Sequence, residues 1–442
     1  MSKMSWQRRG AALVAAVGVL LAGLSAPSAV SAATPPTLDA FYNYTGSTPL
    51  ADIAPGTVLK TRSLPYHLVG LSLPLTATQL LFRSTGALGQ PTVSVTSVLR
   101  APGKFDSTKA LSYQSFYDSL NPADEPSYAI SGGLTLGGII PQVELAVFGA
   151  FVLQGYSIII PDTQGEAADF AAAPEYGMVT LDSIRAASNS PATGLTKSTK
   201  IGLLGYSGGA IATGWASALA PSYAPDVNSR LIGAAEGGVF VDPVHNLHYI
   251  SGSTVWAGVL VMAIIGIARA FQIDLTPYMS AYGLTLFTKL QKASIATVLG
   301  EYPGLTWQKI AKPQYAQPES IPVLVRVVNL LNLGSQPSPT VPMFIGQGAN
   351  GVIEGTSGNK AGIGPGDGVM VAGDVRTLAR QYCSSGTRVE YTQYDALSHV
   401  TSVALWLPAA ITWLDQRFAG VAAPQNCASI KPGNSLAPIP AP

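Results

Sequence analysis

Four short apolar runs constrain the fold of this chain more than any other feature. They are YSIIIP at 156–161, KIGLL at 200–204, LIGAA at 231–235 and VPMFI at 341–345. Runs without polar alternation are typical of strands that are buried on both faces. Segments with helical spacing lie between and after them, at residues 176–187, 210–219, 369–382 and 402–418. This order of strands and helices predicts an α/β fold, with a mostly parallel central sheet and helices on both faces.

Two parts of the chain depart from this order. Residues 78–85 and 91–99 alternate around the turn GALGQ, which predicts an antiparallel hairpin at the edge of the sheet. Residues 242–339 contain only apolar helical stretches, including 14 uninterrupted apolar residues at 255–268. That length suits a buried or interface helix better than a bilayer span. We therefore expect a helical cap at 242–339, inserted between two parts of a core at 33–241 and 340–430.

The N-terminus reads as a secretory signal peptide at residues 1–32. Three basic residues precede an apolar run at 10–24, and small residues follow at 30–33. The run is too short to span a membrane, so we expect an exported protein without a membrane anchor. At the other end, the proline-rich residues 431–442 predict a disordered tail.

Cys383 and Cys427 are the only cysteines. Outside the cell such a pair is most simply a disulfide, and two free thiols are the alternative. Charged residues make up only 11% of the chain, its net charge is +1, and no basic cluster stands out. These numbers give no electrostatic reason to expect binding to nucleic acid.

The pattern GYSGG at 205–209 fits the nucleophile elbow, in which a serine stands on a tight turn between a strand and a helix. Ser207 must then adopt strained backbone geometry, and glycine at positions 205 and 209 lets the strand and helix approach closely. Gly205, Tyr206 and Gly209 frame the serine, and the pattern occurs only once in the chain. The alternative interpretation is a glycine turn without chemistry.

A nucleophilic serine needs a histidine base, which in this arrangement follows the acid in the chain. The chain has four histidines, and His67 comes before the serine. His245 and His248 have the spacing of metal ligands but no nearby cysteine, so we expect polar or capping roles and no metal site. His399 lies between an alternating strand at 389–394 and the last helix. It is the predicted base, and an exposed loop histidine is the alternative.

Asp367 is the predicted acid because it follows the strand at 341–345 and a glycine-rich loop. Asp374 falls inside the next helix, where its carboxylate would be poorly aimed, and Asp395 and Glu354 are further options. A helix-capping role is the other interpretation of Asp367. The expected donors to the oxyanion are the backbone N–H groups of Gly208 and of Asp162, although Asp162 could instead cap a turn.

Several motifs together resemble the secretory lipase family of the yeast lipase A type, which are α/β-hydrolases with a helical cap. They are SYQSFYD at 112–118, PSY at 126–128, IPDTQG at 160–165, GYSGG at 205–209, SYAP at 222–225 and SH at 398–399. The resemblance covers about residues 55–427. It implies hydrolysis of triacylglycerols or other carboxylic esters, with Ser207, Asp367 and His399 as the triad. It also implies oxyanion donors at Asp162 and Gly208. A cysteine that yeast-type relatives carry before the PSY motif is absent here.

The sequence therefore predicts a secreted serine lipase that forms an acyl-enzyme and acts on a lipid or ester substrate at a lipid–water interface. No cofactor or metal is required. A short-chain carboxylesterase or an extracellular acyltransferase could use the same triad. A non-catalytic lipid carrier on a hydrolase scaffold is a third possibility, but serine, acid and histidine in the expected order argue against it.

Overall fold

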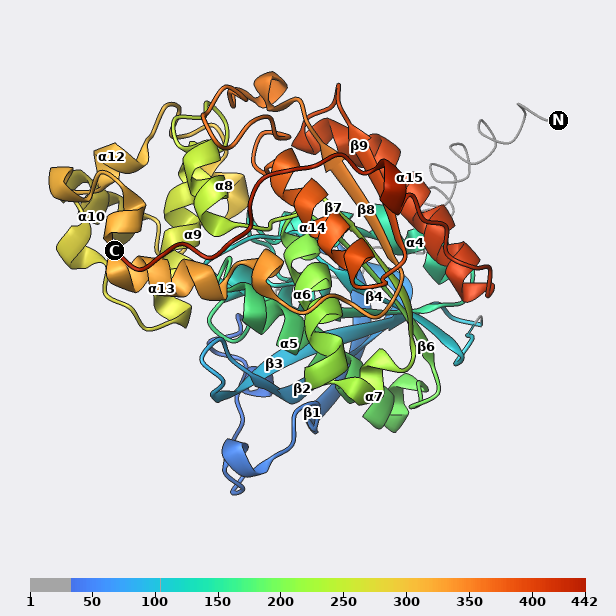
Figure 1. The fold of residues 1–442 in the computed structure, drawn as a ribbon. Coiled ribbons are helices and arrows are strands. Elements are labelled where there is room, and N and C mark those ends of the chain that lie inside the picture. Colours follow the sequence, from blue (N-terminus) through green and yellow to red (C-terminus); the bar gives the residue numbers. More distant parts are fainter. Residues whose placement is uncertain (1–32, 104) are drawn as a thin grey trace.

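The computed structural model describes residues 33–103 and 105–442. The predicted signal peptide, at residues 1–32, lies outside the described residues. The described chain forms one nine-stranded sheet in the order β1-β2-β3-β5-β4-β6-β7-β8-β9 (Figure 1). The strands are β1 (Val58–Leu68), β2 (Leu71–Thr85), β3 (Pro91–Arg100), β4 (Lys109–Gln114), β5 (Ser157–Pro161), β6 (Lys200–Tyr206), β7 (Leu231–Gly237), β8 (Met343–Gly348) and β9 (Val389–Tyr394).

The direction of pairing changes once across this sheet. β1, β2, β3 and β5 pair antiparallel, whereas β5, β4, β6, β7, β8 and β9 pair in parallel. The predicted hairpin is β2–β3, with Thr85 opposite Pro91. The mostly parallel sheet with an antiparallel edge is thus confirmed.

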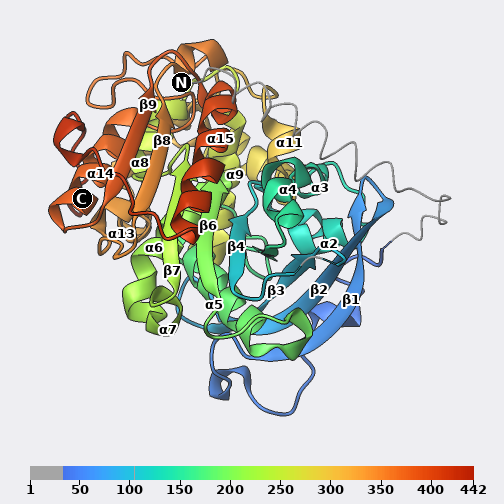
Figure 2. The same ribbon diagram turned by 90° about the vertical axis from the view of Figure 1, so that its right-hand side faces the viewer.

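Helices cover both faces of the sheet (Figure 2). α5, α6 and α14 contribute to the hydrophobic layer on one face, and α4 and α15 to the layer on the other. Successive strand residues serve both layers: Ile159 belongs to the first, and Ile158 and Ile160 belong to the second. Side chains alternate across a strand, so a strand covered on both faces must be apolar throughout. The helices are α2 (Pro126–Ile130), α3 (Ile139–Val143), α4 (Leu145–Leu153), α5 (Ala173–Asn189), α6 (Gly208–Tyr223), α7 (Pro225–Asn228), α14 (Ala372–Ser384) and α15 (His399–Phe418).

The segment between β7 and β8 forms a group of helices beside the sheet (Figure 1). Asp242 begins it as the N-cap of α8 by accepting the N–H groups of Val244 and His245, and Pro243 occupies the first helical position. No helix in the described part of the chain is long and apolar enough to cross a bilayer. The limits of a cap at 242 and 339 stay a prediction. The helices are α8 (Pro243–Ile250), α9 (Ala257–Ala270), α10 (Ala281–Lys289), α11 (Ile295–Val298), α12 (Trp307–Ile310) and α13 (Pro322–Leu330).

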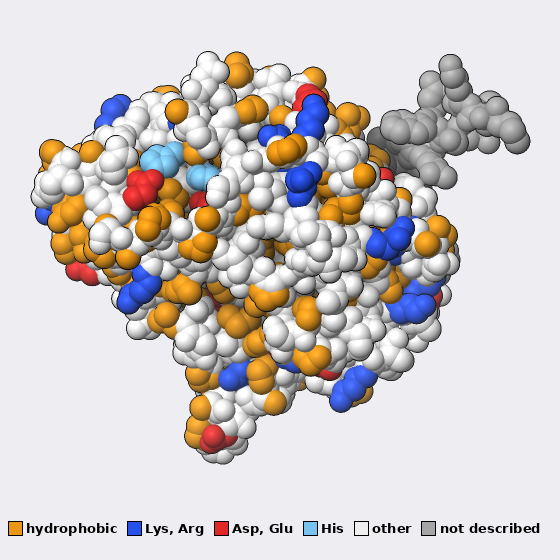
Figure 3. All heavy atoms as spheres, viewed as in Figure 1, with side chains coloured by type: hydrophobic (Ala, Val, Ile, Leu, Met, Phe, Trp, Pro, Cys, Tyr) orange, Lys and Arg blue, Asp and Glu red, His pale blue; other side chains and the backbone are white. Residues whose placement is uncertain are grey.

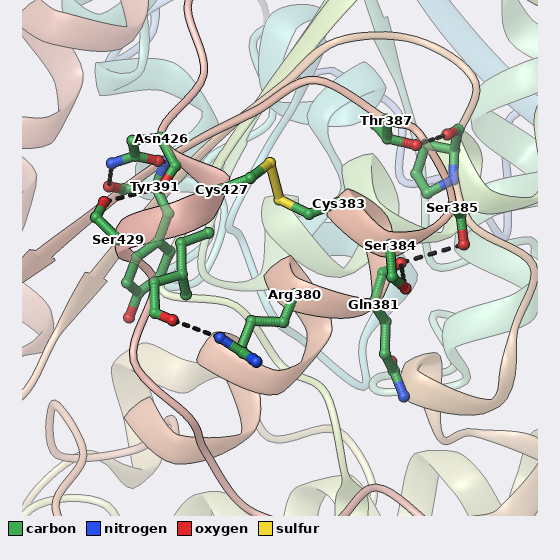
Figure 4. The surroundings of a disulfide bond; sticks show 12 residues. Arg380, Gln381, Cys383, Ser384, Ser385, Thr387, Tyr391, Asn426, Cys427 and Ser429 are labelled. Atoms are coloured by element: carbon green, nitrogen blue, oxygen red, sulfur yellow. Dashed lines mark hydrogen bonds between the residues drawn. A yellow bond between two sulfur atoms is a disulfide. The ribbon is translucent and has the colours of Figure 1, made fainter.

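The predicted disulfide joins Cys383, in the last turn of α14, to Cys427 (Figure 4). Beside it, Asn426 pairs with Tyr391 of β9: the Asn426 side-chain N–H donates to the Tyr391 carbonyl at 2.7 Å, and the Tyr391 backbone N–H donates back at 2.9 Å. The disulfide and these bonds attach the end of the chain to the edge of the sheet.

The disordered tail predicted for residues 431–442 is not what the structure shows. The tail forms no helix or strand, but it lies across α14 and α13. Asn434 donates to the Asp374 carboxylate at 2.7 Å, Leu436 is buried, and the backbone N–H of Ile439 donates to Asn329 at 2.9 Å. Proline prevents regular structure here. The side chains between the prolines nevertheless supply tertiary contacts, which a composition rule does not detect.

Candidate active site

Ser207 stands on the turn between β6 and α6. Its backbone has φ 56° and ψ −121°, a strained conformation for a residue with a side chain. A Cβ atom at Gly205 would overlap the carbonyl of Gly209, and one at Gly209 would overlap the carbonyl of Gln114. Only glycine fits at both places, so the GYSGG pattern has the geometry of an elbow that presents its serine.

His399 lies between Ser207 and Asp367. Its Nε2 is 2.7 Å from the Ser207 Oγ, and its Nδ1 is 2.7 Å from an Asp367 carboxylate oxygen. His399 is the first residue of α15, which Ser398 caps, and its backbone N–H donates to the Asp367 carbonyl at 2.7 Å. The Tyr206 hydroxyl donates to the His399 carbonyl at 2.6 Å. The structure thus brings the three predicted triad residues into one hydrogen-bonded line.

The acid of this line is held by several donors. One Asp367 oxygen accepts the backbone N–H groups of Val369 and Met370 at 3.0 and 2.7 Å. The other accepts the Gln347 side-chain N–H at 2.9 Å besides its bond to His399. Asp367 therefore also caps a turn, but it is not the N-cap of α14, which is Val371. Gln347, fully buried at the end of β8, was missed from the sequence.

The other acids considered from the sequence have different partners. Asp374 lies in α14 and pairs with His245 at 2.9 Å. Asp395 is exposed on the loop before α15. Glu354 accepts the indole N–H of Trp256 and the backbone N–H of Val400. None of the three bonds to His399.

The electrostatic surroundings of His399 favour its protonated form. Burial, the largest single influence, would lower the pKa of this imidazole, but the nearby carboxyl groups, first among them Asp367 through its charge and hydrogen bond, together raise the pKa above its usual value. Glu354 and Asp118 contribute in the same direction. The site is therefore built to stabilise the imidazolium that forms when His399 accepts a proton.

The structure corrects the role predicted for Asp162. Its backbone N–H already donates to the Val95 carbonyl at 2.9 Å, and its carboxylate accepts the Ser127 backbone N–H at 2.8 Å. Burial raises the pKa of this carboxyl to about 7. Strand β4 separates β5, which ends beside Asp162, from β6, which leads to Ser207. Asp162 therefore anchors the PSY segment and does not face Ser207.

Asp118, on the loop after β4, is the residue that approaches the elbow. A Cβ atom on Gly208 would overlap its carboxylate, and both residues line the same cavity as Ser207. The Asp118 backbone has φ 33°, and its N–H donates to no backbone carbonyl among the residues described. Burial raises the pKa of its side chain to about 8. The sequence signal was the SYQSFYD motif, whose last residue is Asp118.

An apolar cavity opens beside Ser207. Its volume is about 830 Å³, including the part open to solvent. Among the described residues that line it, the polar side chains besides Ser207 are those of Asp118, Asn246 and Trp256. Most of the lining is aliphatic, and the largest share of these aliphatic residues comes from α8, α9 and α13, including Leu247, Ile250, Leu260, Ile264, Leu324 and Val328.

His245 and His248 do not converge on one point. His245 pairs with Asp374 at 2.9 Å, and His248 pairs with Glu319 at 2.6 Å. Throughout residues 33–103 and 105–442, no group of three or more histidine, cysteine or acidic residues could hold a metal ion.

Comparisons with known proteins agree with the fold and the motifs. A family model described as secretory lipase matches residues 131–426. Lipase 4 of Candida albicans is 30% identical over 427 residues, covering 94% of this chain and 87% of the relative. A Mycobacterium tuberculosis protein named probable inactive lipase is 32% identical over 378 residues, covering 83% and 79%.

The solved structure of Candida antarctica lipase A in its closed state superposes with a TM-score of 0.77 at 24% identity and covers 93% of both chains. This likeness identifies the α/β-hydrolase fold, and the resemblance drawn from the motifs is confirmed. With its family model matched over about two thirds of its length, the chain belongs to the secretory lipase family.

Proposed function

We propose that the protein is a lipase that hydrolyses triacylglycerols and related carboxylic esters through Ser207, His399 and Asp367. The observation that carries this proposal is the line of two 2.7 Å hydrogen bonds through these residues, at the edge of an apolar cavity. A nucleophile, its base and an acid that orients the base are the groups that acyl transfer through serine requires.

In the proposed reaction, Ser207 Oγ attacks the ester carbonyl carbon while His399 Nε2 accepts its proton. Asp367 holds the tautomer with hydrogen on Nδ1 and stabilises the imidazolium. His399 then returns the proton to the departing alcohol, which leaves an acyl group on Ser207. Water attacks this acyl-enzyme with His399 again as the base, and the fatty acid leaves.

The negative oxygen of each tetrahedral intermediate needs backbone donors. We assign them to the N–H groups of Gly208 and Asp118. Gly208 is the first residue of α6, where a helix leaves N–H groups without internal partners and carries partial positive charge. Loss of one such donor typically lowers kcat by about 10²–10³-fold. Asp118 takes the place that the sequence had suggested for Asp162.

The cavity supports a hydrophobic acyl chain as substrate. Burial of each CH₂ group contributes about 0.8 kcal/mol, so an aliphatic lining favours longer chains. We propose that α8–α13 act as a cap that supplies this lining. Apolar side chains are spread over the face shown in Figure 3 and charged ones are scattered, which suits contact with a lipid surface. The family description and the N-terminal sequence support export from the cell.

The proposal is tested by purifying the protein from Ala33 onward beside Ser207→Ala, with Ser198→Ala on an exposed loop as the matched control. Each is assayed on an emulsified long-chain triacylglycerol and on a soluble short-chain ester. Intact mass after treatment with a serine-reactive phosphonate reports whether the nucleophile is labelled. We expect wild type and control to cleave both substrates and to be labelled, and Ser207→Ala to do neither.

Other results would change the proposal in defined ways. Cleavage of the short ester alone would indicate a carboxylesterase, and transfer to an added alcohol in preference to water would indicate an acyltransferase. Activity of Ser207→Ala equal to that of wild type would show that Ser207 is not the nucleophile.

A further inference from the structure

Glu354 connects two elements that flank His399. It ends a short 3-10 helix, η9 (Gly351–Glu354), on the loop after β8. One carboxylate oxygen accepts the backbone N–H of Val400 at 2.9 Å, and the other accepts the indole N–H of Trp256 at 2.7 Å. Val400 follows His399 in the first turn of α15, and Trp256 directly precedes α9. The side chain of Glu354 is buried, and its bond to Trp256 is buried with it, whereas its bond to Val400 is partly buried.

Trp256 in turn contacts His399. The two ring centroids are 5.2 Å apart and the ring planes lie at 83°, an edge-to-face arrangement. Trp256 also lines the cavity beside Ser207. Because an indole carries a single polar hydrogen, its bond to Glu354 fixes how the ring lies against the imidazole. Trp256, which directly precedes α9, therefore contacts the base of the proposed triad in a fixed orientation.

The neighbourhood of Asp367 is shaped to admit this pair. A Cβ atom on Gly368 would lie 2.7 Å from a Glu354 carboxylate oxygen and 2.9 Å from the indole nitrogen of Trp256. Gly368 has φ +132°, which side chains rarely adopt. Its carbonyl accepts the Thr356 hydroxyl at 2.7 Å. The residue next to the acid therefore has to be glycine for Glu354 and Trp256 to approach.

We propose that Glu354 is a positioning residue for His399. It holds Trp256 against the imidazole, secures the first turn of α15, and places a second negative charge near the ring. This inference rests on the proposed function, since it assigns Glu354 a part in the same reaction. Glu354 touches no substrate in this assignment and acts only through His399 and Trp256.

The charge of Glu354 has a consequence with a definite sign. The ionisable groups that face His399 are Asp367 after β8, Glu354 in η9, Asp118 after β4 and Tyr206 in β6. Burial lowers the pKa of His399, while Asp367, Glu354 and Asp118 raise it. Without the charge of Glu354, the pKa of His399 falls, so the base stays neutral to lower pH. The imidazolium that forms during catalysis is then less stable, so kcat falls.

The test compares Glu354→Gln with Asp395→Asn, which also removes a carboxylate near His399 in the sequence but from an exposed loop. The soluble short-chain ester is used from about pH 4 to about pH 9, and kcat and kcat/KM are measured separately. For Glu354→Gln we expect the acid limb of kcat/KM to move to lower pH by roughly half a pH unit to one pH unit, and kcat to fall roughly tenfold. Asp395→Asn should match wild type in both.

A second variant keeps the charge and removes the other contact. Trp256→Phe retains a ring but loses the indole N–H, so we expect kcat to fall several-fold with the acid limb unmoved. If Glu354→Gln leaves both kcat and the acid limb unchanged, the inference is overturned. A lower Tm alone would then indicate that Glu354 has a purely structural role. If Glu354→Gln does not fold, an unchanged kcat in Trp256→Phe overturns it.

The two proposals fail in distinguishable ways. Activity in Ser207→Ala would refute the proposed function whatever Glu354 does. Loss of activity in Ser207→Ala together with wild-type behaviour of Glu354→Gln would refute the positioning role alone.

Discussion

Replacement of Asp367 by asparagine should abolish most activity without preventing folding. The asparagine oxygen can still accept the N–H groups of Val369 and Met370, which bond to one carboxylate oxygen in the native site. The new amide nitrogen, however, would point its hydrogens at His399 Nδ1 and at the Gln347 side-chain N–H. His399 would then turn its lone pair toward the asparagine and its hydrogen toward Ser207, which is the wrong tautomer for a base.

The expected loss in kcat is about 10⁴-fold, the size found for this exchange in serine hydrolase triads, or about 5 kcal/mol of transition-state stabilisation. Turnover of the soluble short-chain ester measures it, with KM determined separately and thermal unfolding as the check on folding. KM should change little, because Asp367 does not line the cavity. A folded Asp367→Asn protein with more than about a tenth of wild-type kcat would refute the assignment of the acid, since correct tautomers would then not depend on this carboxylate.

Three further predictions follow from the same structure. The kcat/KM of the wild type should fall in acid with a midpoint above pH 6.5, because His399 must be neutral to act as the base and Asp367 raises the pKa of His399. A midpoint below pH 6.5 in the pH profile would contradict this prediction. The double variant Cys383→Ser, Cys427→Ser should lower the free energy of unfolding by up to about 4 kcal/mol, since the disulfide closes a loop of 44 residues. Urea unfolding measures this loss, and the ester assay should show that activity at room temperature persists. Ile264→Trp should lower kcat/KM for long-chain esters roughly tenfold more than for short ones, because the indole would occupy the cavity; equal losses on a chain-length series would place the acyl chain elsewhere.

The features that the sequence predicted well depend on local patterns. The apolar runs at 156–161 and 200–204 form strands that are covered on both faces. Such a strand must be apolar throughout, so each run can be recognised from its own residues. GYSGG predicted the tight turn at Ser207, because the elbow requires glycine at fixed offsets from the serine, and the role of Ser207 as nucleophile stays a proposal. His399 was predicted as the base because it follows the serine and lies between the strand at 389–394 and the last helix, and its catalytic role stays a proposal.

The features that the sequence did not predict depend on which segments become neighbours. Asp162 directly follows β5, a buried apolar strand that comes before β6 in the chain, and it was predicted as an oxyanion donor for that reason. In the sheet, β4 pairs with both β5 and β6, and Asp118 after β4 takes that place. No local pattern reveals this order, because β4 precedes β5 in the chain but lies between β5 and β6 in the sheet. The contacts of the tail were missed for the same reason: Asn434 donates to Asp374 of α14, and the Leu436 carbonyl accepts the side-chain N–H of Asn332, which follows α13.

The arrangement of the sheet explains how the segment between β7 and β8 comes to lie beside the proposed site. Ser207, Asp367 and His399 follow β6, β8 and β9, and these strands run parallel, so all three lie at the same edge. The chain leaves β7 between them at that edge, so the helices from α8 to α13 must begin beside Ser207. This one segment then supplies both the aliphatic lining of the cavity and the Trp256 ring that contacts His399. Glu354 lies on the loop that follows β8, so its bond to Trp256 joins the segment between β7 and β8 to the proposed triad. In the proposed positioning role, a shift of Trp256 at the start of α9 would reach His399 through the contact of the two rings.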